Sequence, residues 1–333
     1  MRRSYSIGSK FLTATVSFIV PVQDEIREVE AMMRVQAKHY HPDLEAAMDL
    51  LISAGGKRIR PALTILAGKM LGAEHDLLIL MATAIEMLHT ATLVHDDLID
   101  SSLLRRGMPT LNSKWSPGAT VLTGDFIFAR AAKLASETNS VPVMKLFSNT
   151  LTTIVNGELV QLLGSRCTAD RDNYLQRIYA KTASLFETSA TSAALIARTS
   201  PEITEQLRQY GYEIGMAFQI IDDILDFTGD QVTIGKPVGS DLRQGIVTLP
   251  VMKFIDAHPD DPQSQMLVNG ECLNDEQVDQ LVEAIRQSDA IQLSYQEAAD
   301  FVSRGLASIR KLSPTPSRYS LEELANYIVE RKL

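Results

Sequence analysis

Apolar residues recur along most of the chain at the three- or four-residue spacing that places them on one face of an α-helix. The pattern is clear between Val22 and Leu51, where Ile26, Val29 and Met33 would share such a face. It predicts further helices at 61–71, 77–101, 118–137, 141–163, 170–198, 203–227, 248–256, 275–288, 291–312 and 321–331. Runs that alternate apolar and polar residues, as half-buried strands would, do not stand out, so we expect an all-α protein.

Polar segments rich in glycine and proline separate these helices. Gly55-Gly56 breaks the first pattern, and Pro61 stands where a new helix can begin. The connections at 105–117 and 229–245 are longer, but no internal repeat and no interdomain linker are visible. We therefore expect one helical bundle around a deep central cavity, formed by residues 21–333 and preceded by a partly disordered N-terminal extension at 1–20.

Composition narrows the function classes. The 333 residues are 45% hydrophobic, which is enough for one large core. The net charge of -9 disfavours a nucleic-acid partner, so an anionic ligand must be met by local cations or by metal ions. The first residues lack the uninterrupted apolar run and the clear cleavage site of a signal peptide. The two cysteines, Cys167 and Cys272, have no ligand-like neighbours. We expect two ordinary thiols, neither a disulfide nor a zinc site, and a cytoplasmic location.

Two acidic clusters have the same Asp-Asp-x-x-Asp pattern, and each ends an apolar helical segment. Their members are Asp96, Asp97 and Asp100, and Asp222, Asp223 and Asp226. Positions i and i+4 share a helical face, so the first and last carboxylates of each cluster point the same way. Mg²⁺ takes a few carboxylates and completes its octahedron with water and phosphate oxygens. One cluster alone could be a solvated surface, but two predict the walls of a magnesium–diphosphate site.

Basic residues supply the complementary charge. The segment GGKRIRP brings Lys57, Arg58 and Arg60 to a glycine break and a helix start, where backbone amides and arginine forks suit phosphate. The spacing is not that of a P-loop. Arg105 and Arg106 follow the first acidic cluster closely. Weaker candidates, each of which alone would be read as a surface or packed residue, are His89, Lys181, Thr182 and Lys236.

The segments GGKRIRP, HTATLVHDDLIDSSLLRRG, YAKTASLF, FQIIDDILDFTGD and GKPVGSDLRQG, in this order, resemble the trans-polyprenyl diphosphate synthases of the long-chain type. The resemblance runs from about residue 20 to the end. It implies the prenyl-synthase bundle, with the two aspartate motifs on opposite walls of its cavity. It also implies a prenyltransferase that adds isopentenyl diphosphate head-to-tail (1'-4) to an allylic diphosphate, which is geranyl, farnesyl or geranylgeranyl diphosphate. Mg²⁺ (three ions per active site), a homodimer and a peripheral membrane contact for product release are implied as well.

The resemblance assigns roles by position. It implies metal ligands at Asp96, Asp100, Asp222, Asp223 and Asp226, with Asp97 beside them. It implies an isopentenyl diphosphate site at Lys57, Arg60, His89 and Arg106. It implies an allylic diphosphate site at Arg105, Lys181, Thr182, Gln219 and Lys236. The residues implied to be catalytic are Asp96, Asp97, Asp100, Arg105, Lys181, Asp222 and Lys236. One departure is Ile246, where shorter-chain members often carry a lysine; Arg243 is a candidate substitute.

Residues on the helix that carries Asp96 are expected to limit the length of the product. One helical turn rises about 5.4 Å, similar to an extended isoprene unit. Counting back from Asp96 gives Thr92 and Ala91, then Leu88, and no aromatic ring blocks the first turn. This predicts a C30–C50 product. The alternative is a C20 product, if a residue from a facing helix closes the cavity earlier; the candidates are Phe147 and Phe186.

Three rival functions remain to be weighed. A terpene cyclase also ionises an allylic diphosphate at an aspartate motif, but it does not need the second diphosphate site that GGKRIRP and Arg106 indicate. A regulatory subunit of a heteromeric synthase often lacks one aspartate motif, whereas both are intact here. A purely structural helical protein would not explain the matched acidic and basic sites.

Overall fold

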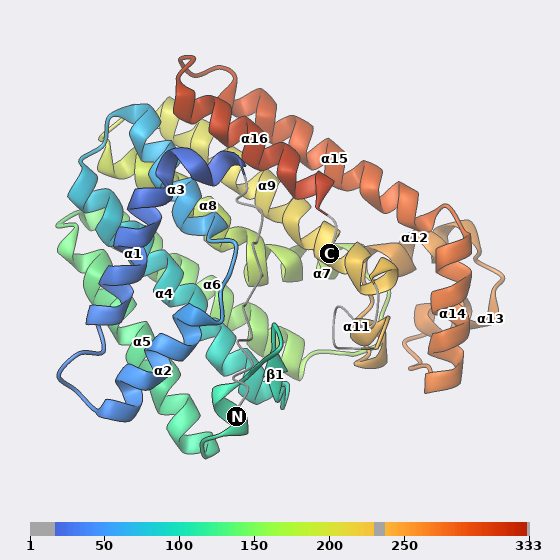
Figure 1. Cartoon of the computed structure of the whole chain (residues 1–333). Helices are drawn as coiled ribbons and strands as arrows, with labels where there is room; N and C mark the ends of the chain where they lie inside the picture. Colours follow the sequence, from blue (N-terminus) through green and yellow to red (C-terminus); the bar gives the residue numbers. More distant parts are fainter. Residues whose placement is uncertain (1–16, 230–236, 332–333) are drawn as a thin grey trace, which may run out of the picture.

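The computed structural model describes residues 17–229 and 237–331, most of which lie in helices (Figure 1). The N-terminal part contains the 3₁₀ helix η1 (Ser17–Val22), α1 (Gln23–Val35), α2 (Pro42–Ser53), α3 (Ile59–Leu71) and α4 (His75–Ile99). The middle contains strands β1 (Leu104–Arg105) and β2 (Met108–Pro109), then η2 (Leu111–Ser113), α5 (Pro117–Glu137), α6 (Val141–Leu163), α7 (Arg171–Ile178), the π-helix η3 (Tyr179–Ala183), α8 (Ser184–Ile196) and α9 (Pro201–Thr228). The C-terminal part contains α11 (Ser240–Arg243), α12 (Leu249–Ala257), α13 (Pro262–Val268), α14 (Asp275–Gln287), α15 (Ala290–Ile309) and α16 (Pro316–Glu330).

Helix α4 lies at the centre of the bundle, packed against α5, α3, α1 and α8. It is the one described helix that is long and apolar enough to cross a membrane, with a mean hydropathy of 1.8. However, 72% of that apolar window is buried against neighbouring helices, as in the core helix of a bundle. Its apolar side chains therefore hold the acidic end of the helix, from Asp96 onward, at the rim of the bundle interior.

Helix α9 carries the second acidic cluster and packs against α15, α8, η3 and α16. Small residues permit the close approach to α8 and η3. A Cβ at Gly211 would lie 2.6 Å from the carbonyl oxygen of Phe186, and one at Gly215 would lie 2.6 Å from the Cα of Ala183. Side chains at these positions would push α9 away. The two glycines thus set how closely α9, which carries Asp222, approaches α8 and η3, the latter of which carries Lys181.

The two ends of the described chain lie together. Phe18 of η1 is fully buried and its ring centroid lies 5.3 Å from that of Tyr327 on α16. The packed domain therefore includes η1, and the expected boundary at residue 20 falls within this element. Residues 1–16 of the expected N-terminal extension lie outside the described residues.

The observed elements confirm the all-α expectation but differ from the expected helices in several places; α11 and α13, for example, were not expected. The helical pattern between 22 and 51 is divided into α1 and α2, and the one between 170 and 198 into α7, η3 and α8. The connection at 105–117 contains the antiparallel β1–β2 hairpin, with Arg105 paired to Met108. The hairpin has two residues per strand, too few to show an alternating pattern.

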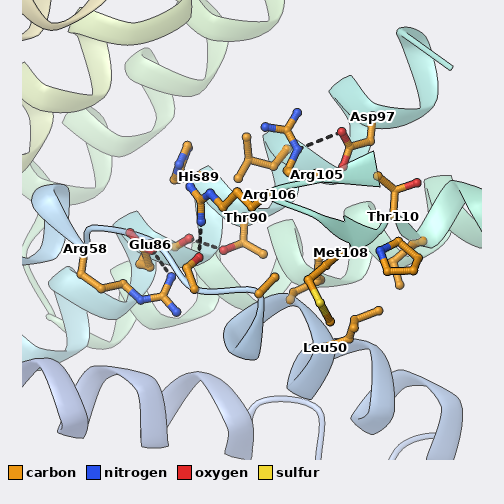
Figure 2. A pocket seen from close by; sticks show the side chains of 16 residues that line it. Leu50, Arg58, Glu86, His89, Thr90, Asp97, Arg105, Arg106, Met108 and Thr110 are labelled. Carbon is orange, nitrogen blue, oxygen red and sulfur yellow. Dashed lines mark hydrogen bonds and ion pairs between the residues drawn. The ribbon is translucent and has the colours of Figure 1, made fainter. Parts of the chain in front are cut away.

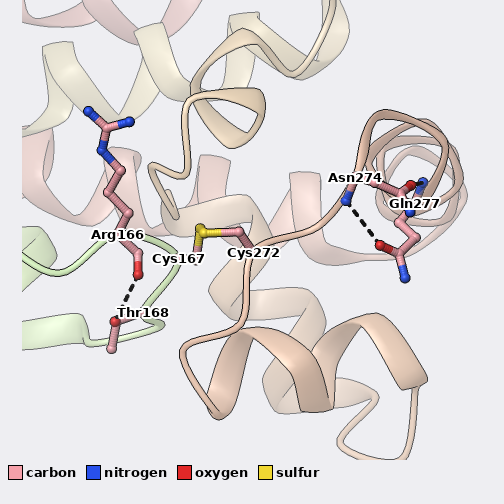
Figure 3. The surroundings of a disulfide bond; sticks show 6 residues. All are labelled: Arg166, Cys167, Thr168, Cys272, Asn274 and Gln277. Carbon is pink, nitrogen blue, oxygen red and sulfur yellow. Dashed lines mark hydrogen bonds between the residues drawn. A yellow bond between two sulfur atoms is a disulfide. The ribbon is translucent and has the colours of Figure 1, made fainter.

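The expectation of two ordinary thiols is wrong. Cys167, between α6 and α7, and Cys272, before α14, form a disulfide with their Cα atoms 5.1 Å apart (Figure 3). A sequence separation of 105 residues gave no indication that the fold would bring them together. Because the cytoplasmic location was inferred from reduced thiols, it loses that support and stays a prediction.

Candidate active site

The first acidic cluster lies where α4 ends, and its three carboxylates do not play the same part. Asp96 and Asp100 line a cavity of about 980 Å³ bounded also by α6, α7 and the segment 243–246. Asp97 is instead buried, and its Oδ1 accepts a hydrogen bond of 2.9 Å from Arg105 Nε. Asp97 therefore ties the β1–β2 hairpin to α4, while its neighbours face the cavity.

Charge is concentrated around Asp96. Burial raises the pKa of Asp96 to about 6; Lys181 opposes this shift, while Glu158 and Asp100 add to it. For Lys181, burial lowers the pKa, but Glu158, Asp96 and Asp100 outweigh it and raise the value. Lys181 Nζ lies 3.2 Å from Glu158 Oε1. Three carboxylates facing one lysine leave an excess of negative charge that a divalent cation would relieve.

In the second cluster, Asp222 faces a basic partner from the end of the chain. Its Oδ1 accepts a hydrogen bond of 2.6 Å from Arg331 Nη2. The same nitrogen donates to the carbonyl of Phe218 at 3.2 Å, and the guanidinium lies 4.0 Å from the centroid of that ring. The Asp222 side chain keeps 40% of its surface exposed, so part of the carboxylate is available to a ligand.

Asp223 is turned into the protein. It accepts hydrogen bonds from the Tyr174 hydroxyl at 2.7 Å and from Gln219 Nε2 at 2.8 Å. Thr182 Oγ1 in turn donates to Gln219 Oε1 at 2.6 Å. Burial, with Asp241 nearby, raises the pKa of Asp223 to about 8. This chain of contacts links α7, η3 and α9, so Thr182 and Gln219 support the second cluster as well as the expected allylic site.

Asp226 anchors the connection that follows α9. Its Oδ1 accepts hydrogen bonds from the amide of Ser240 at 3.1 Å and from the Ser240 hydroxyl at 2.8 Å. Its Oδ2 accepts one from the amide of Asp241 at 3.2 Å. The carboxylate thus caps the short helix α11 in the way that an N-cap residue does. This contact sets where the segment after residue 237 rejoins the cavity wall.

The donor set fits a shared magnesium site better than a closed one. Across residues 17–229 and 237–331, no group of three His, Cys, Asp or Glu side chains lies close enough to enclose a metal ion. Asp96 and Asp100 nevertheless line the cavity with carboxylate oxygens, which Mg²⁺ prefers, and Asp222, which is not part of that lining, has a partly exposed carboxylate. Mg²⁺ usually keeps waters and binds through one or two carboxylates together with substrate phosphates. These residues fit an ion that is completed by a diphosphate.

A second, basic pocket of about 50 Å³ lies beside the first cluster (Figure 2). Arg58, Glu86, His89, Arg105 and Arg106 are among the residues that line it. Figure 2 shows Arg106 reaching toward His89, with Arg105 turned toward Asp97. The Arg106 side chain donates to the carbonyl of Gly55. Arg58 and Arg105 are paired with Glu86 and Asp97 of the same lining, so Arg106 gives the pocket its net positive charge, which favours an anionic occupant.

Arg60 and His89 meet at the edge of this pocket. Arg60 Nη1 lies 3.3 Å from His89 Nε2, and the Arg60 guanidinium lies 4.6 Å from the ring centroid of Phe186. Burial lowers the pKa of Arg60 to about 10, so the side chain stays charged at neutral pH. Burial, followed by Arg60 and Arg106, holds the pKa of His89 well below its usual range, so the ring is neutral. Arg60 Nε is buried without a hydrogen-bond partner among the described groups.

Comparison with known proteins decides the family. The profile described as polyprenyl synthetase matches residues 41–285. The chain belongs to this family. It is 36% identical over 288 residues to the octaprenyl diphosphate synthase of Escherichia coli, covering 84% of this chain and 88% of that protein. It is 35% identical over 312 residues to heptaprenyl diphosphate synthase component 2 of Bacillus subtilis, covering 93% of this chain and 89% of the other.

A solved structure agrees with this assignment. The polyprenyl synthase of Caulobacter crescentus, complexed with calcium and isoprenyl diphosphate, matches with a TM-score of 0.87 and 33% identity. The match covers 95% of this chain and 97% of that one. The long-chain trans-prenyl synthase resemblance and the helical-bundle fold are therefore confirmed, and the chain is a trans-prenyltransferase.

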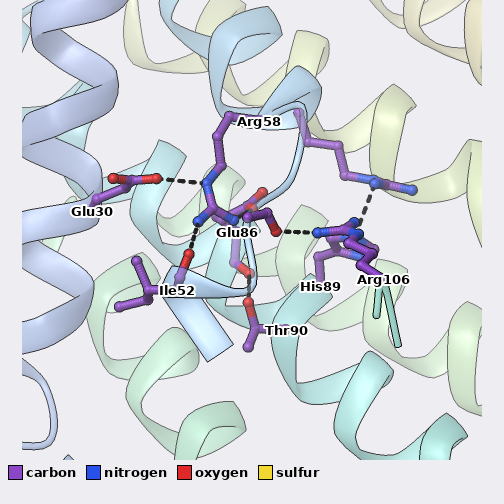
Figure 4. A network of polar contacts seen from close by, with 9 residues as sticks. Glu30, Ile52, Arg58, Glu86, His89, Thr90 and Arg106 are labelled. Carbon is purple, nitrogen blue, oxygen red and sulfur yellow. Dashed lines mark hydrogen bonds and ion pairs between the residues drawn. The ribbon is translucent and has the colours of Figure 1, made fainter. Parts of the chain in front are cut away.

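Not every charged residue of the family's motifs faces the site. Arg58 of GGKRIRP is buried and pairs with Glu30 at 2.9 Å and with Glu86 at 2.7 Å (Figure 4). It holds the glycine segment in place rather than facing a ligand. Lys57 is exposed, with its Nζ 5.5 Å from the ring centroid of Tyr327. Lys236 lies outside the described residues.

Some site residues escaped the sequence analysis. Glu86 and Glu158 lie in apolar helices without a neighbouring acidic residue, and Tyr174 lies in an ordinary polar segment. Arg331, near the C-terminus, is one of two adjacent basic residues, and nothing in the sequence around it indicates a contact with Asp222. Arg243 was identified as a substitute for a cation at Ile246, and the structure shows its guanidinium donating to Asp275 and Asp279 of α14. Its charge is therefore already shared with two carboxylates.

Proposed function

We propose that the chain catalyses Mg²⁺-dependent condensation of isopentenyl diphosphate with an allylic diphosphate, head-to-tail (1'-4), giving an all-trans C30–C50 polyprenyl diphosphate. The observation that carries this is the pairing of two different anion sites. One is acidic and lined by Asp96, Asp100 and Lys181; the other is basic and formed around His89 and Arg106. A terpene cyclase has no use for the second site.

The chain's own residues divide the work between the two substrates. Arg60 and Arg106, with neutral His89 between them, are suited to the diphosphate of isopentenyl diphosphate, together with Lys57. Lys181, on η3, lines the acidic cavity and is suited to the allylic diphosphate. Arg105 of the hairpin, which lines the basic pocket and donates to Asp97, is a further expected contact, as are Thr182, Gln219 and Lys236. Asp96, Asp100 and Asp222 would hold Mg²⁺, with Asp97, Asp223 and Asp226 supporting them. When bound, Mg²⁺ supplies stabilisation of the charge on the departing diphosphate, and we expect three ions per site.

The reaction needs positioning and charge stabilisation rather than an enzyme nucleophile. The allylic C–O bond breaks, and its electron pair leaves with the diphosphate next to Lys181 and Arg105. The double bond of isopentenyl diphosphate, held by Arg60 and Arg106, attacks the allylic cation and forms the new C–C bond. A proton then leaves the adjacent carbon for an oxygen of the departing diphosphate. Apolar side chains of α6, such as Ile154 and Leu159, line the same cavity and offer the allylic cation a partly apolar surrounding.

The C30–C50 length is supported by the relatives' names and by Thr92, which lines the larger cavity one turn before Asp96. Ala91 and Leu88 are buried in the core beside it. Phe147 and Phe186 are also buried, so closure of the cavity at a C20 product stays the alternative. The preferred primer remains one of the three allylic diphosphates expected above.

A homodimer in the cytoplasm, with a peripheral membrane contact for product release, completes the proposal. Exposed apolar side chains on α5 and α6 support an interface; Leu122, Val141 and Leu163 are 68%, 67% and 80% exposed. One relative is named as a component of a synthase. A heteromeric enzyme, in which a different subunit binds the exposed apolar side chains of α5 and α6, is therefore the second candidate for the assembly.

The test uses purified protein, farnesyl diphosphate, labelled isopentenyl diphosphate and Mg²⁺, followed by dephosphorylation and chain-length analysis. We expect one discrete polyprenol of C30–C50 length. A C20 product would keep the chemistry but reject the length. The Asp96→Asn variant should lose about 10³-fold in kcat, whereas Asp125→Asn, which removes another cavity carboxylate, should retain activity. No incorporation with any primer would reject the single-chain enzyme and direct the search to a second subunit.

A further inference from the structure

A cation with no assigned role lies at the acidic cavity. Arg166, in the connection between α6 and α7, lines the cavity that also contains Asp96, Asp100 and Lys181. Its side chain is exposed and extends away from the neighbouring disulfide (Figure 3). Its carbonyl oxygen accepts a hydrogen bond from Thr168 at 3.3 Å, but its guanidinium pairs with no carboxylate in the described parts of the chain.

The other lysine and arginine side chains of this cavity already have protein partners. Lys181 lies 3.2 Å from Glu158, Arg177 donates to the carbonyl of Val247 at 2.8 Å, and Arg243 donates to Asp275 and Asp279. Lys181 and Arg243 are thus paired with carboxylates, and Arg177 has a donor engaged by a backbone carbonyl. Among the described cations of the wall, Arg166 is therefore the one whose donors are all available to a substrate.

The backbone that carries Arg166 is held from two sides. On one side, the amide of Cys167 donates to the carbonyl of Gly245 at 2.7 Å. A Cβ at Gly245, whose φ is +77°, would lie 2.9 Å from Cys167 Sγ and 3.1 Å from Arg166 Cβ, so the two segments are in direct contact. On the other side, the disulfide joins Cys167 to Cys272. An exposed side chain on an anchored backbone loses less conformational freedom when it binds a ligand.

We propose that Arg166 is a further binding residue for the diphosphate held beside Asp96 and Asp100, and that the Cys167–Cys272 disulfide positions it. The inference rests on the proposed function and adds a residue to its allylic site. An arginine fork suits phosphate oxygens and gives charge-assisted hydrogen bonds. Ile246, next to Gly245, lines the same cavity and contributes no charge there. Arg166 supplies the positive charge to this side of the site.

The direct test compares Arg166→Gln with Arg27→Gln, which removes an exposed arginine from α1. Arg166→Gln should raise the KM for farnesyl diphosphate about tenfold, with the KM for isopentenyl diphosphate unchanged. It should also weaken binding of inorganic pyrophosphate in the presence of Mg²⁺, measured by calorimetry, by a similar factor. Adding Ile246→Lys to Arg166→Gln should restore most of both losses, because it returns a cation to the same wall. Unchanged KM and pyrophosphate binding in Arg166→Gln, or equal effects in Arg27→Gln, would overturn the proposal.

The role of the disulfide is tested through Arg166. Cys272 is exposed, so dithiothreitol can reach the bond; the reductant is oxidised to its cyclic disulfide while the protein gains two thiols. Reduction, or Cys272→Ser, should raise the KM for farnesyl diphosphate in the wild-type background and have no further effect in Arg166→Gln. An equal additional loss in both backgrounds would show that the disulfide acts independently of Arg166. Pyrophosphate binding tests the role of Arg166 without requiring catalysis. If the wild-type protein binds pyrophosphate but makes no polyprenol, the proposed function is rejected while the binding role of Arg166 can still be tested.

Discussion

Arg331 Nη2 lies 2.6 Å from Asp222 Oδ1, so the last described helix ends on the first carboxylate of the second aspartate motif. The guanidinium is nearly buried, with 5% of the side chain exposed, whereas Asp222 keeps 40%. A cation in this position neutralises Asp222 as a metal ion would. Arg331 and Mg²⁺ therefore compete for the charge of this carboxylate.

The first prediction concerns this competition. Arg331→Gln should lower the Mg²⁺ concentration that gives half-maximal activity by about tenfold, because breaking a charged hydrogen bond costs about 1.5–3 kcal/mol. The measurement is a Mg²⁺ titration of initial rates at saturating substrate. Arg310→Gln, which removes an exposed partner of Glu322, is the control and should not shift the titration. A higher Mg²⁺ requirement in Arg331→Gln would mean that Arg331 assists the site.

The second prediction separates two neighbouring aspartates. Asp222→Asn should raise the Mg²⁺ requirement at least tenfold and lower kcat by about 10²-fold, since it removes a proposed ligand. Asp223→Asn should change both by less than about threefold, because a neutral amide can still contact Gln219 and the Tyr174 hydroxyl can accept as well as donate. Urea unfolding of both variants checks that the fold is kept. Equal Mg²⁺ effects would show that Asp223 is also a ligand.

The third prediction concerns product length. Thr92→Phe should shorten the product by at least one isoprene unit, because a ring at this position fills the cavity one turn of about 5.4 Å before Asp96. Thr92→Ser should leave the length unchanged, since serine keeps the hydroxyl that donates to the His89 carbonyl at 2.8 Å. Chain-length analysis of the dephosphorylated products gives the result. An unchanged distribution in Thr92→Phe would place the tail along another wall.

The fourth prediction concerns pH. Because the folded-state pKa of His89 is lowered, the unfolded chain binds a proton there near pH 6.5 while the folded chain does not. Stability is therefore unaffected by His89 above pH 6.5 and falls as the pH drops below it, by about 1.4 kcal/mol per unit until the ring protonates in the folded state. The measurement is urea unfolding between pH 5 and 8 of wild type and His89→Asn. The variant should lack this part of the slope; equal slopes would contradict the neutral ring.

How much of this the sequence could predict differs between helices and contacts. The spacing of apolar residues placed α6 at its observed bounds, and the i, i+4 rule separated Asp96 and Asp100 from Asp97. These features depend on local periodicity, which one sequence contains. The pairing of Asp223 with Tyr174, 49 residues away, depends on how α7 and α9 pack, and no local pattern reports it.

The cysteines show the same limit more sharply. Their separation of 105 residues and their unremarkable neighbours favoured two thiols, yet the fold brings the connection after α6 against the segment before α14. Arg58 is a milder case: its motif predicted a phosphate contact, but burial against Glu86 gives it a structural part. Motifs indicate which residues gather at a site, whereas tertiary packing decides which of them face it.

The π-helix η3 limits how this region can change in length. A π turn holds one residue more than the α-helix on either side of it, and one residue corresponds to about 100° of rotation. Deleting a single residue between Tyr179 and Ala183 would convert this turn into an ordinary α-helical turn, which keeps α7 in phase with α8 but changes the direction of Lys181 and Thr182 within it. A homologous chain with a one-residue gap here should therefore keep Tyr174 against Asp223 but lose the present placement of Lys181. The spacing from Tyr174 to Lys181 is thus a countable signature by which sequences that preserve this arrangement can be sorted from those that have lost it.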